Sequence, residues 1–145
     1  MRVLVQRVSS ARVEVEGRTA GQIGRGLLLF VGFGKQDMPE SLPAAVKKLL
    51  ELRVFNDEQG KMNLSLQDIK GSLLVVSQFT LYANCSRGRR PDFTPAASPQ
   101  HAERLYDQFI NLFKESPLQV QSGIFAADMK VSLINDGPVT LMLEF

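Results

Sequence analysis

The motif SQFTL lies near the end of the most apolar strand-like segment, 71–82, and is the first place where side chains could do chemistry. Apolar residues precede it without interruption, so Ser77, Gln78 and Thr80 are polar groups added to a core strand. In a strand, Gln78 and Thr80 would share one face, and Ser77 would lie on the other with Phe79. Buried hydroxyl and amide groups need hydrogen-bond partners. Either a ligand supplies them or the strand has simply reached the surface.

Three arginines, Arg87, Arg89 and Arg90, stand near Phe93 in a polar stretch with two prolines, 83–98, which we call the arginine loop. Guanidinium groups bind phosphates through paired hydrogen bonds. The loop is therefore a candidate contact for a nucleic-acid backbone. The alternative is a solvated basic loop without a partner.

The motif NDGPVT, residues 135–140, predicts a tight turn between two strands. Gly137 can adopt backbone conformations that other residues avoid, and Pro138 has no N–H group to donate. A Gly-Pro bond is also one that can be cis. Taken alone, the motif indicates a turn and nothing more.

The rarity of catalytic residue types narrows the possible reactions. The chain has one histidine, His101, and one cysteine, Cys85. A Ser-His-Asp or Cys-His mechanism would need His101, which the helical pattern places opposite the apolar stripe of its helix. Cys85 lies in the polar loop with no acid or base near it in sequence. A structural zinc site needs about four Cys or His ligands, and one chain with a single histidine and a single cysteine cannot supply them. A carboxylate-rich magnesium site stays open, although no cluster of Asp and Glu argues for one.

The composition is that of an ordinary globular protein, with 44% hydrophobic and 22% charged residues among 145. This length predicts one domain over 1–145. The net charge of +2 is too small to indicate bulk coating of nucleic acid. No stretch approaches the roughly 20 apolar residues of a membrane helix, and the first residues do not read as a signal peptide. A single cysteine suits a reducing compartment.

Hydrophobic periodicity predicts the elements that must position these motifs. Alternating or apolar runs predict strands over 2–8, 11–17, 27–33 and 71–82, a short strand at 53–57, and two or three strands within 118–145. Helical spacing predicts helices over 39–53 and from Pro99 to about Lys114, the latter with Ser98 as N-cap. The fold class is therefore α+β, with a mostly antiparallel sheet and two main helices.

Taken in order, these segments resemble the D-aminoacyl-tRNA deacylase family, also called D-tyrosyl-tRNA deacylase. The resemblance runs through MRVLVQRV, ELRVFNDEQGKMNLSL, LLVVSQFTLYA, RGRRPDF and ADMKVSLINDGPVTLMLEF, which together span nearly the whole chain. SQFTL and NxGPVT are the family's two signature motifs, and both stand here without substitution. Each motif alone is a weak pattern, but both at this separation are very specific.

The resemblance implies a cytosolic, homodimeric hydrolase with the family's barrel-like fold and no metal or organic cofactor. Such an enzyme cleaves the ester between a D-amino acid and the terminal adenosine of tRNA, releasing tRNA and the D-amino acid. The family also removes glycine mischarged onto alanine tRNA. D-aminoacyl-tRNA and glycyl-tRNA are therefore the expected partners, and chiral proofreading is the expected role.

The resemblance also implies site residues. Gly137 and Pro138 would form a cis pair that reaches into the other subunit's pocket and rejects L-amino acids. The ester carbonyl would lie near the backbone N–H groups of Phe79 and Thr80, in a catalytic segment that includes Ser77 and Gln78. Thr80 could be a nucleophile or could orient a water, or the 2′-hydroxyl of the substrate could assist. We prefer the last route, because no side-chain base near Thr80 is evident.

The terminal adenosine would bind in a pocket whose implied lining residues are Ala102, Phe125 and Met129. Ordinary core packing is the alternative role for Phe125 and Met129. Two other functions stay open for the whole chain. It could be a non-catalytic nucleic-acid-binding dimer that uses the arginine loop, or a hydrolase of small metabolites on the same fold.

Overall fold

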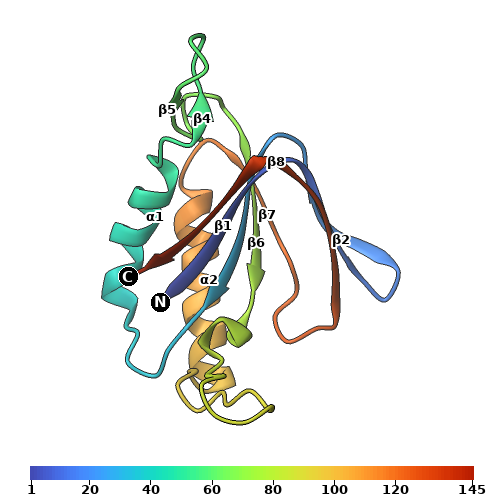
Figure 1. The fold of residues 1–145 in the computed structure, drawn as a ribbon, viewed down its shortest axis with the longest axis vertical. Helices are drawn as coiled ribbons and strands as arrows, with labels where there is room; N and C mark the ends of the chain where they lie inside the picture. The colour runs from blue at the N-terminus through green and yellow to red at the C-terminus, as the bar shows by residue number, and fades with distance from the viewer.

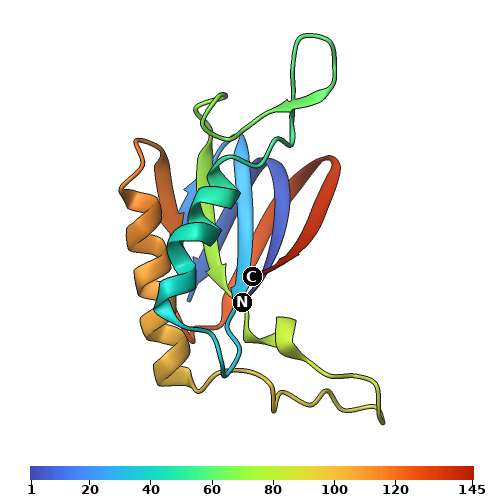
Figure 2. The ribbon, with the colours of Figure 1, turned by 90° about the vertical axis from the view of Figure 1, so that its left-hand side faces the viewer.

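The computed structural model describes residues 1–145 and contains a six-stranded sheet with two α-helices packed on one side of it (Figures 1 and 2). The sheet strands are β1 (Arg2–Val15), β2 (Arg18–Ile23), β3 (Gly26–Gly32), β6 (Ser72–Ser77), β7 (Gln119–Ser122) and β8 (Met129–Glu144). The helices are α1 (Leu42–Leu50) and α2 (Pro99–Lys114). Smaller elements are the 3₁₀ helices η1 (Pro39–Ser41) and η2 (Phe79–Tyr82) and a separate hairpin of β4 (Phe55–Asn56) and β5 (Met62–Leu64).

The strand order is β2-β1-β3-β6-β7, with β8 paired to β1. Strand β1 pairs antiparallel with β2, β3 and β8, which confirms the expected α+β fold with a mostly antiparallel sheet. The pairs β3–β6 and β6–β7 are parallel, which the sequence reading did not anticipate. Parallel neighbours need long crossover connections. Helix α1 lies in the first crossover and α2 in the second, so both helices cover the same side of the sheet.

The two strands predicted at 2–8 and 11–17 are one long strand, β1. Its first half pairs with β3 and its second half with β2, while β8 pairs with both halves. This arrangement bends the sheet toward a barrel. The two end strands of the sheet order, β2 and β7, approach each other: a Cβ atom on Gly21 of β2 would lie 2.9 Å from the carbonyl oxygen of Ser122 in β7. Only glycine permits so close an approach, and the sheet is nearly closed there.

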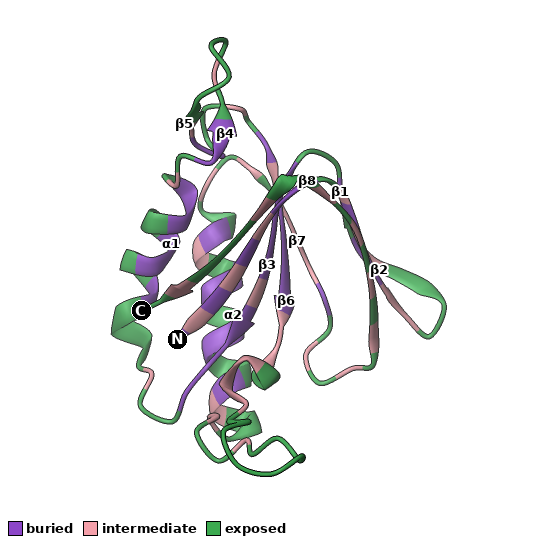
Figure 3. Cartoon of the chain, viewed as in Figure 1, coloured by how far each residue is buried: buried purple, intermediate pink, exposed green.

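The core has two parts, one on each face of the sheet. In Figure 3 the buried residues gather along the central strands and on parts of both helices. The larger part contains 23 buried residues and lies between the sheet and the two helices. Tyr106 of α2 lies in it and donates a 2.8 Å hydrogen bond to the carbonyl of Val75 in β6, which ties the helix to the central strand. The smaller part, inside the bent sheet, consists of Val8, Ala11, Val13, Ile23, Leu28, Leu74 and Val76.

The predicted strand over 71–82 is too long, because β6 ends at Ser77 and the next residues form η2. The Gln78 N–H group donates to the carbonyl of Val31 at 2.7 Å, and β3 ends one residue later. With no partner strand beyond this point, the chain turns into a 3₁₀ helix. The prediction that strand alternation places Gln78 and Thr80 on one face is therefore wrong in its reason. Their side chains do meet, through a hydrogen bond made by the turn.

The other predicted elements are present with altered bounds, whereas β2 and β5 were not predicted. The helix predicted over 39–53 is a 3₁₀ turn followed by α1, and α2 has the predicted bounds. Ser98 is the N-cap residue of α2, but its side chain makes no capping hydrogen bond. The predicted turn at 135–138 lies within β8, which continues along β1 on both sides of it.

Candidate functional site

A cavity of about 610 Å³ opens where β3 and β6 end. Thirteen of its 18 lining residues are hydrophobic. They come from the ends of β3 and β6, the first residue of η2, the end of the arginine loop, the first turn of α2 and the segment that leads into β8. Figure 1 shows η2 below the end of β6 and beside the N-terminal end of α2. The cavity is thus built by segments that are far apart in sequence.

Six of the twelve site residues predicted from the sequence line this cavity. The lining includes Ser77, Gln78, Phe79, Ala102, Phe125 and Met129. Thr80 follows directly but is exposed and does not line the cavity. The side-chain amide of Gln78 donates a hydrogen bond to the hydroxyl oxygen of Thr80, which holds that hydroxyl next to a residue of the cavity lining.

The cavity holds almost no ionisable groups. Asp128 is the one charged residue in its lining, and it forms an exposed ion pair with Lys130 at 3.0 Å. His101 and Cys85 are not among the lining residues. The backbone N–H groups of Phe79 and Thr80 begin η2, where the first N–H groups of a helix have no carbonyl partner inside it. The cavity can therefore enclose a flat apolar group, has unpaired backbone donors and a hydroxyl in the adjoining η2, and has no histidine, lysine or cysteine in its lining.

The arginine loop borders this cavity through Phe93, whose ring packs against that of Phe79. Arg87, Arg89 and Arg90 are all exposed, and none of them forms an ion pair or a side-chain hydrogen bond. Three unpaired cations thus stand in the loop that forms part of the cavity rim.

The Gly137–Pro138 peptide bond is cis, and both residues are exposed. We call residues 135–138 the Gly-Pro bend. The side-chain oxygen of Asn135 accepts the N–H of Val139 at 2.8 Å, and its amide donates to the hydroxyl of Thr140 at 2.7 Å. The bend is thus closed by its own side chain.

The Gly-Pro bend and the cavity lie at opposite ends of the sheet. Asn135 pairs with Val8 of β1, and Val8 pairs with Gly26 of β3. Gly26 in turn pairs with Ser72, the first residue of β6. Gln78 comes six residues after Ser72, which at about 3.3 Å per residue is about 20 Å along the strand. Within one chain, the structure does not bring the two signature motifs together.

Comparison with known proteins decides the family. A family model described as D-Tyr-tRNA(Tyr) deacylase matches residues 4–144. The chain belongs to the D-Tyr-tRNA(Tyr) deacylase family. It is 54% identical over 144 residues to a D-aminoacyl-tRNA deacylase of Thermosipho africanus, covering 99% of this chain and 97% of that protein. It is 56% identical over 143 residues to one of Saccharophagus degradans, covering 99% of each.

Two solved structures share the fold of this deacylase family member. One, described as c-Myc DNA Unwinding Element Binding Protein, is 40% identical with a TM-score of 0.94 and covers 100% of this chain and 99% of its own. The other, described as a probable eukaryotic D-amino acid tRNA deacylase, is 20% identical with a TM-score of 0.84 and covers 98% and 97%. The second match shows the fold alone. Family membership makes the chain a hydrolase, which confirms the expectation of an enzyme.

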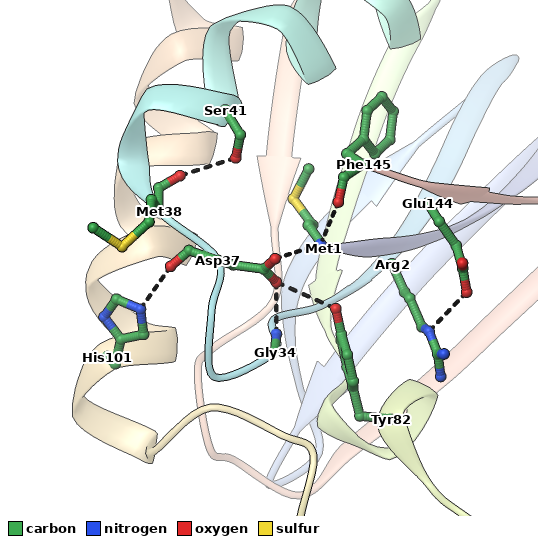
Figure 4. Close-up of polar contacts among 10 residues, drawn as sticks. All are labelled: Met1, Arg2, Gly34, Asp37, Met38, Ser41, Tyr82, His101, Glu144 and Phe145. Carbon is green, nitrogen blue, oxygen red and sulfur yellow. Dashed lines mark hydrogen bonds and ion pairs between the residues drawn. The ribbon is translucent and has the colours of Figure 1, made fainter.

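The deacylase holds η2 in place through Asp37, which sequence reasoning missed (Figure 4). One carboxylate oxygen of Asp37 accepts the N–H of Gly34 at 2.6 Å and the hydroxyl of Tyr82, the last residue of η2, at 3.2 Å. The other accepts from the amino group of Met1 at 2.7 Å. The Asp37 carbonyl oxygen lies 2.8 Å from Nε2 of His101, so this histidine is engaged rather than free on its helix.

Tyr82 itself is packed from both sides. The Arg2 guanidinium lies 4.7 Å from the centre of its ring and donates to the carbonyl of Leu81 at 2.9 Å. A Cβ atom on Gly34 would lie 2.8 Å from the ring, so glycine is required there. Burial, and then the negative charge of Asp37, raise the pKa of Tyr82 to about 12. The phenol is therefore neutral and donates to Asp37 at physiological pH.

Arg7 is a second residue of the deacylase that sequence reasoning missed. Its guanidinium is buried and donates to the carbonyl of Asp136 at 2.9 Å and to the carbonyl of Val54 at 2.6 Å. It also lies 3.5 Å from the Asp136 carboxylate. Arginine in an alternating strand gives no signal of this role, because the partners are remote in sequence.

Two further findings bear on the deacylase as a whole. No group of three or more His, Cys, Asp and Glu side chains gathers where it could hold a metal ion. None of the helices combines the length and the apolar character that crossing a membrane would require.

Proposed function

We propose that this enzyme hydrolyses the ester that joins a D-amino acid to the terminal adenosine of tRNA. It would also remove glycine mischarged onto alanine tRNA, acting in the cytoplasm as one domain over 1–145. The observation that carries the proposal is the apolar cavity bordered by the intact SQFTL segment. Its volume and apolar lining suit a nucleoside, with Ala102, Phe125 and Met129 as the adenosine-binding residues.

The chemistry fits a site without a strong base. Water adds to the ester carbonyl, the bond to the ribose oxygen breaks, and the products are a carboxylate and a free hydroxyl on tRNA. An aminoacyl ester is already activated, so positioning and stabilisation of the oxyanion supply much of the rate. The backbone N–H groups of Phe79 and Thr80 are the donors for that oxyanion.

Three routes are open for the attack on the ester; in the first, Thr80 takes the acyl group and water then hydrolyses that acyl-enzyme, whereas in the other two water attacks directly. Thr80 could act as a nucleophile, Thr80 could orient the water, or the 2′-hydroxyl of the substrate could assist. We favour the third route. The Thr80 oxygen accepts a hydrogen bond from the Gln78 amide, and an amide N–H donor cannot remove the hydroxyl proton.

Chiral selection would come from Gly137 and Pro138 of a second subunit. D- and L-amino acids differ in where the side chain points, and a rigid main-chain surface rejects L side chains by collision while it accepts glycine. Because about 20 Å of strand separates the bend from the cavity of its own chain, a homodimer is the simplest way to join them.

An incompletely covered apolar face supports dimerisation. Leu4 of β1 pairs directly with Phe30 of β3 and with Met142 of β8, so these three side chains share one face of the sheet. Leu4 and Phe30 are only half-buried, and Met142 is exposed. A second copy would remove this surface from water.

In the deciding experiment, the purified protein is incubated with D-tyrosyl-tRNA, L-tyrosyl-tRNA or alanine tRNA that carries glycine, with and without EDTA. Release of the amino acid is measured. We expect cleavage of the D and glycyl substrates, sparing of the L substrate, no effect of EDTA, and a dimer by sedimentation. tRNA binding without any release would indicate the non-catalytic binding dimer instead. Equal cleavage of a free D-tyrosine ester would indicate a hydrolase of small metabolites.

A further inference from the structure

An aromatic pair, made of the exposed Phe79 and the half-buried Phe93, lies beside the candidate adenosine cavity. The rings of Phe79 and Phe93 have their centres 5.0 Å apart and their planes inclined by 63°. Both residues line the cavity, yet Phe79 remains 57% exposed. Phe93 supports the ring from the side in this edge-to-face arrangement, which leaves an aromatic face open. An exposed ring with one aromatic neighbour at its side can stack on a flat partner.

The loop that carries Phe93 is fixed on both sides of it. On one side, Asn84 and Asp92 exchange two backbone hydrogen bonds, of 2.7 and 3.0 Å. On the other side, Ala97 donates to the carbonyl of Phe33 at 2.9 Å, in the wall of the cavity. Thr94 also donates to the Asp92 carboxylate through its N–H group at 2.9 Å. Phe93 is thus part of a fixed rim, while the arginines extend from the closed turn of residues 85–91.

We infer that Phe79 and Phe93 form a stacking platform for the unpaired base that precedes the terminal adenosine of the substrate RNA. This inference rests on the proposed function, which puts the terminal adenosine in the cavity. The strand must leave the cavity across its rim, where it meets first the aromatic pair and then the loop of Arg87, Arg89 and Arg90. Open aromatic faces beside unpaired cations are the combination that binds single-stranded nucleic acid, by base stacking and phosphate contacts. The platform would hold the strand in register with the ester, whatever that base is.

The test compares three substrates that share one D-tyrosyl ester: full D-tyrosyl-tRNA, the same tRNA with an abasic residue before the terminal adenosine, and D-tyrosyl-adenosine. The variants are Phe79→Leu and Phe93→Leu, which keep apolar bulk, and Phe79→Tyr, which keeps the aromatic face. Met62→Ala is the matched control, because Met62 is equally exposed but lies on the remote β4–β5 hairpin.

With the wild type, we expect the abasic residue to lower kcat/KM about tenfold, mainly through KM. Phe79→Leu and Phe93→Leu should lower kcat/KM on full tRNA by a similar factor, and the abasic residue should then cost little more. Phe79→Tyr should restore the wild-type value, and Met62→Ala should not change it.

Equal losses on D-tyrosyl-tRNA and D-tyrosyl-adenosine would overturn the inference, because the rings would then only shape the cavity. An abasic penalty that is the same in wild type and variants would also overturn it. So would loss of the dimer in Phe93→Leu, which would assign the pair to a second copy of the chain. If the wild type cleaves none of the three substrates, the proposed function itself fails, which is a different result.

Discussion

The guanidinium of Arg7 donates a 2.9 Å hydrogen bond to the carbonyl oxygen of Asp136, although 129 residues separate them in the chain. Arg7 lies in β1 and is buried, whereas Asp136 lies in the exposed Gly-Pro bend of β8. The second guanidinium bond, to the carbonyl of Val54, ties the same group to the segment before β4. The exposed Gly-Pro bend is thereby attached to a buried guanidinium that a second hydrogen bond holds in place, which restricts how far the bend can move.

Arg7→Lys should loosen this attachment. An ammonium group is a point charge without the planar fork, so it cannot serve both carbonyls with the same geometry. We expect a loss of about 1–3 kcal/mol in the free energy of unfolding, because a carbonyl loses its partner. Discrimination between D- and L-tyrosyl-tRNA should weaken in parallel. Urea denaturation and paired hydrolysis assays measure the two effects, with Arg18→Lys as an exposed control on β2. Full selectivity in a destabilised Arg7→Lys would show that the attachment serves stability alone.

Gly137→Ala should disturb the Gly-Pro bend itself, whereas Arg7→Lys changes the side chain that holds it. Gly137 has a φ of +133°, and an added Cβ would lie 2.8 Å from the Arg7 guanidinium. We expect a cost of about 1–3 kcal/mol from the backbone conformation, together with loss of D-over-L selectivity. Gly17→Ala is the matched control, because Gly17 has a φ of +74° but nothing within 4 Å of an added Cβ. If both variants keep wild-type selectivity, the chiral surface lies elsewhere.

Thr80→Ala separates the catalytic routes. It removes the hydroxyl but keeps the backbone N–H group at the start of η2. Under the substrate-assisted route, single-turnover hydrolysis of D-tyrosyl-tRNA should stay within about tenfold of the wild type, while a 2′-deoxy terminal adenosine should lower it about 100-fold or more. Cleavage of the 2′-deoxy substrate at the normal rate would rule out that route. A collapse of the rate in Thr80→Ala would return Thr80 to a chemical role.

Replacing Arg87, Arg89 and Arg90 with alanine should weaken tRNA binding without slowing the chemical step. Each phosphate contact contributes about 0.7–0.9 to the slope of log affinity against log salt, so the slope should fall by about 2. Binding measured between 50 and 200 mM salt checks the slope, and single-turnover rates at saturation check the chemistry. A triple variant of Arg18, Lys47 and Lys48 removes equal charge from exposed positions elsewhere. An unchanged slope in the loop variant would mean that the arginines are merely solvated.

Tyr82 should make stability fall at alkaline pH. Its pKa is raised to about 12 in the folded protein, first by burial and then by the charge of Asp37, against about 10 in the unfolded chain. A raised pKa favours the neutral phenol, so its contribution is complete below pH 10 and is lost as the pH rises through about 12. The denaturation midpoint of the wild type should therefore approach that of Tyr82→Phe across this interval. A constant difference between the two proteins from pH 8 to 12 would contradict the assignment.

The sequence predicted most of what local pattern controls. The apolar runs of β3 and β6 follow from burial on both faces of the sheet, and the amphipathic spacing of α2 follows from burial on one side, so these elements could be predicted from the sequence. The end of β6 could not be predicted, because it depends on where β3 ends and no longer offers a hydrogen-bond partner beyond Gln78. The parallel pairing of β6 with β3 and β7 could not be predicted either, since it depends on how the two crossover connections pack against the sheet.

The same limit applies to the site. SQFTL was singled out by the apolar run that it follows, and Ala102, Phe125 and Met129 were found through the family resemblance. The structure brings these three and Ser77, Gln78 and Phe79 of the motif to one cavity. Asp37 and Arg7 were not found, because a charged residue in a loop or strand carries no mark of a partner 36 or 129 residues away. Their roles are properties of the folded chain rather than of any local motif.

The pairing of β1 with β8 also governs when the chain can finish folding on the ribosome. Arg2 pairs with Glu144, and the pairing continues to Val15 with Met129, so the longest ladder of the molecule joins segments from the two ends of this sequence. At about 5–20 residues per second, synthesis leaves one edge of β1 without a partner for several seconds before β8 is made. An unpaired strand edge is a template for pairing with other chains. The nascent chain therefore presents an unpaired edge of β1 during that interval, which β8 covers in the finished protein.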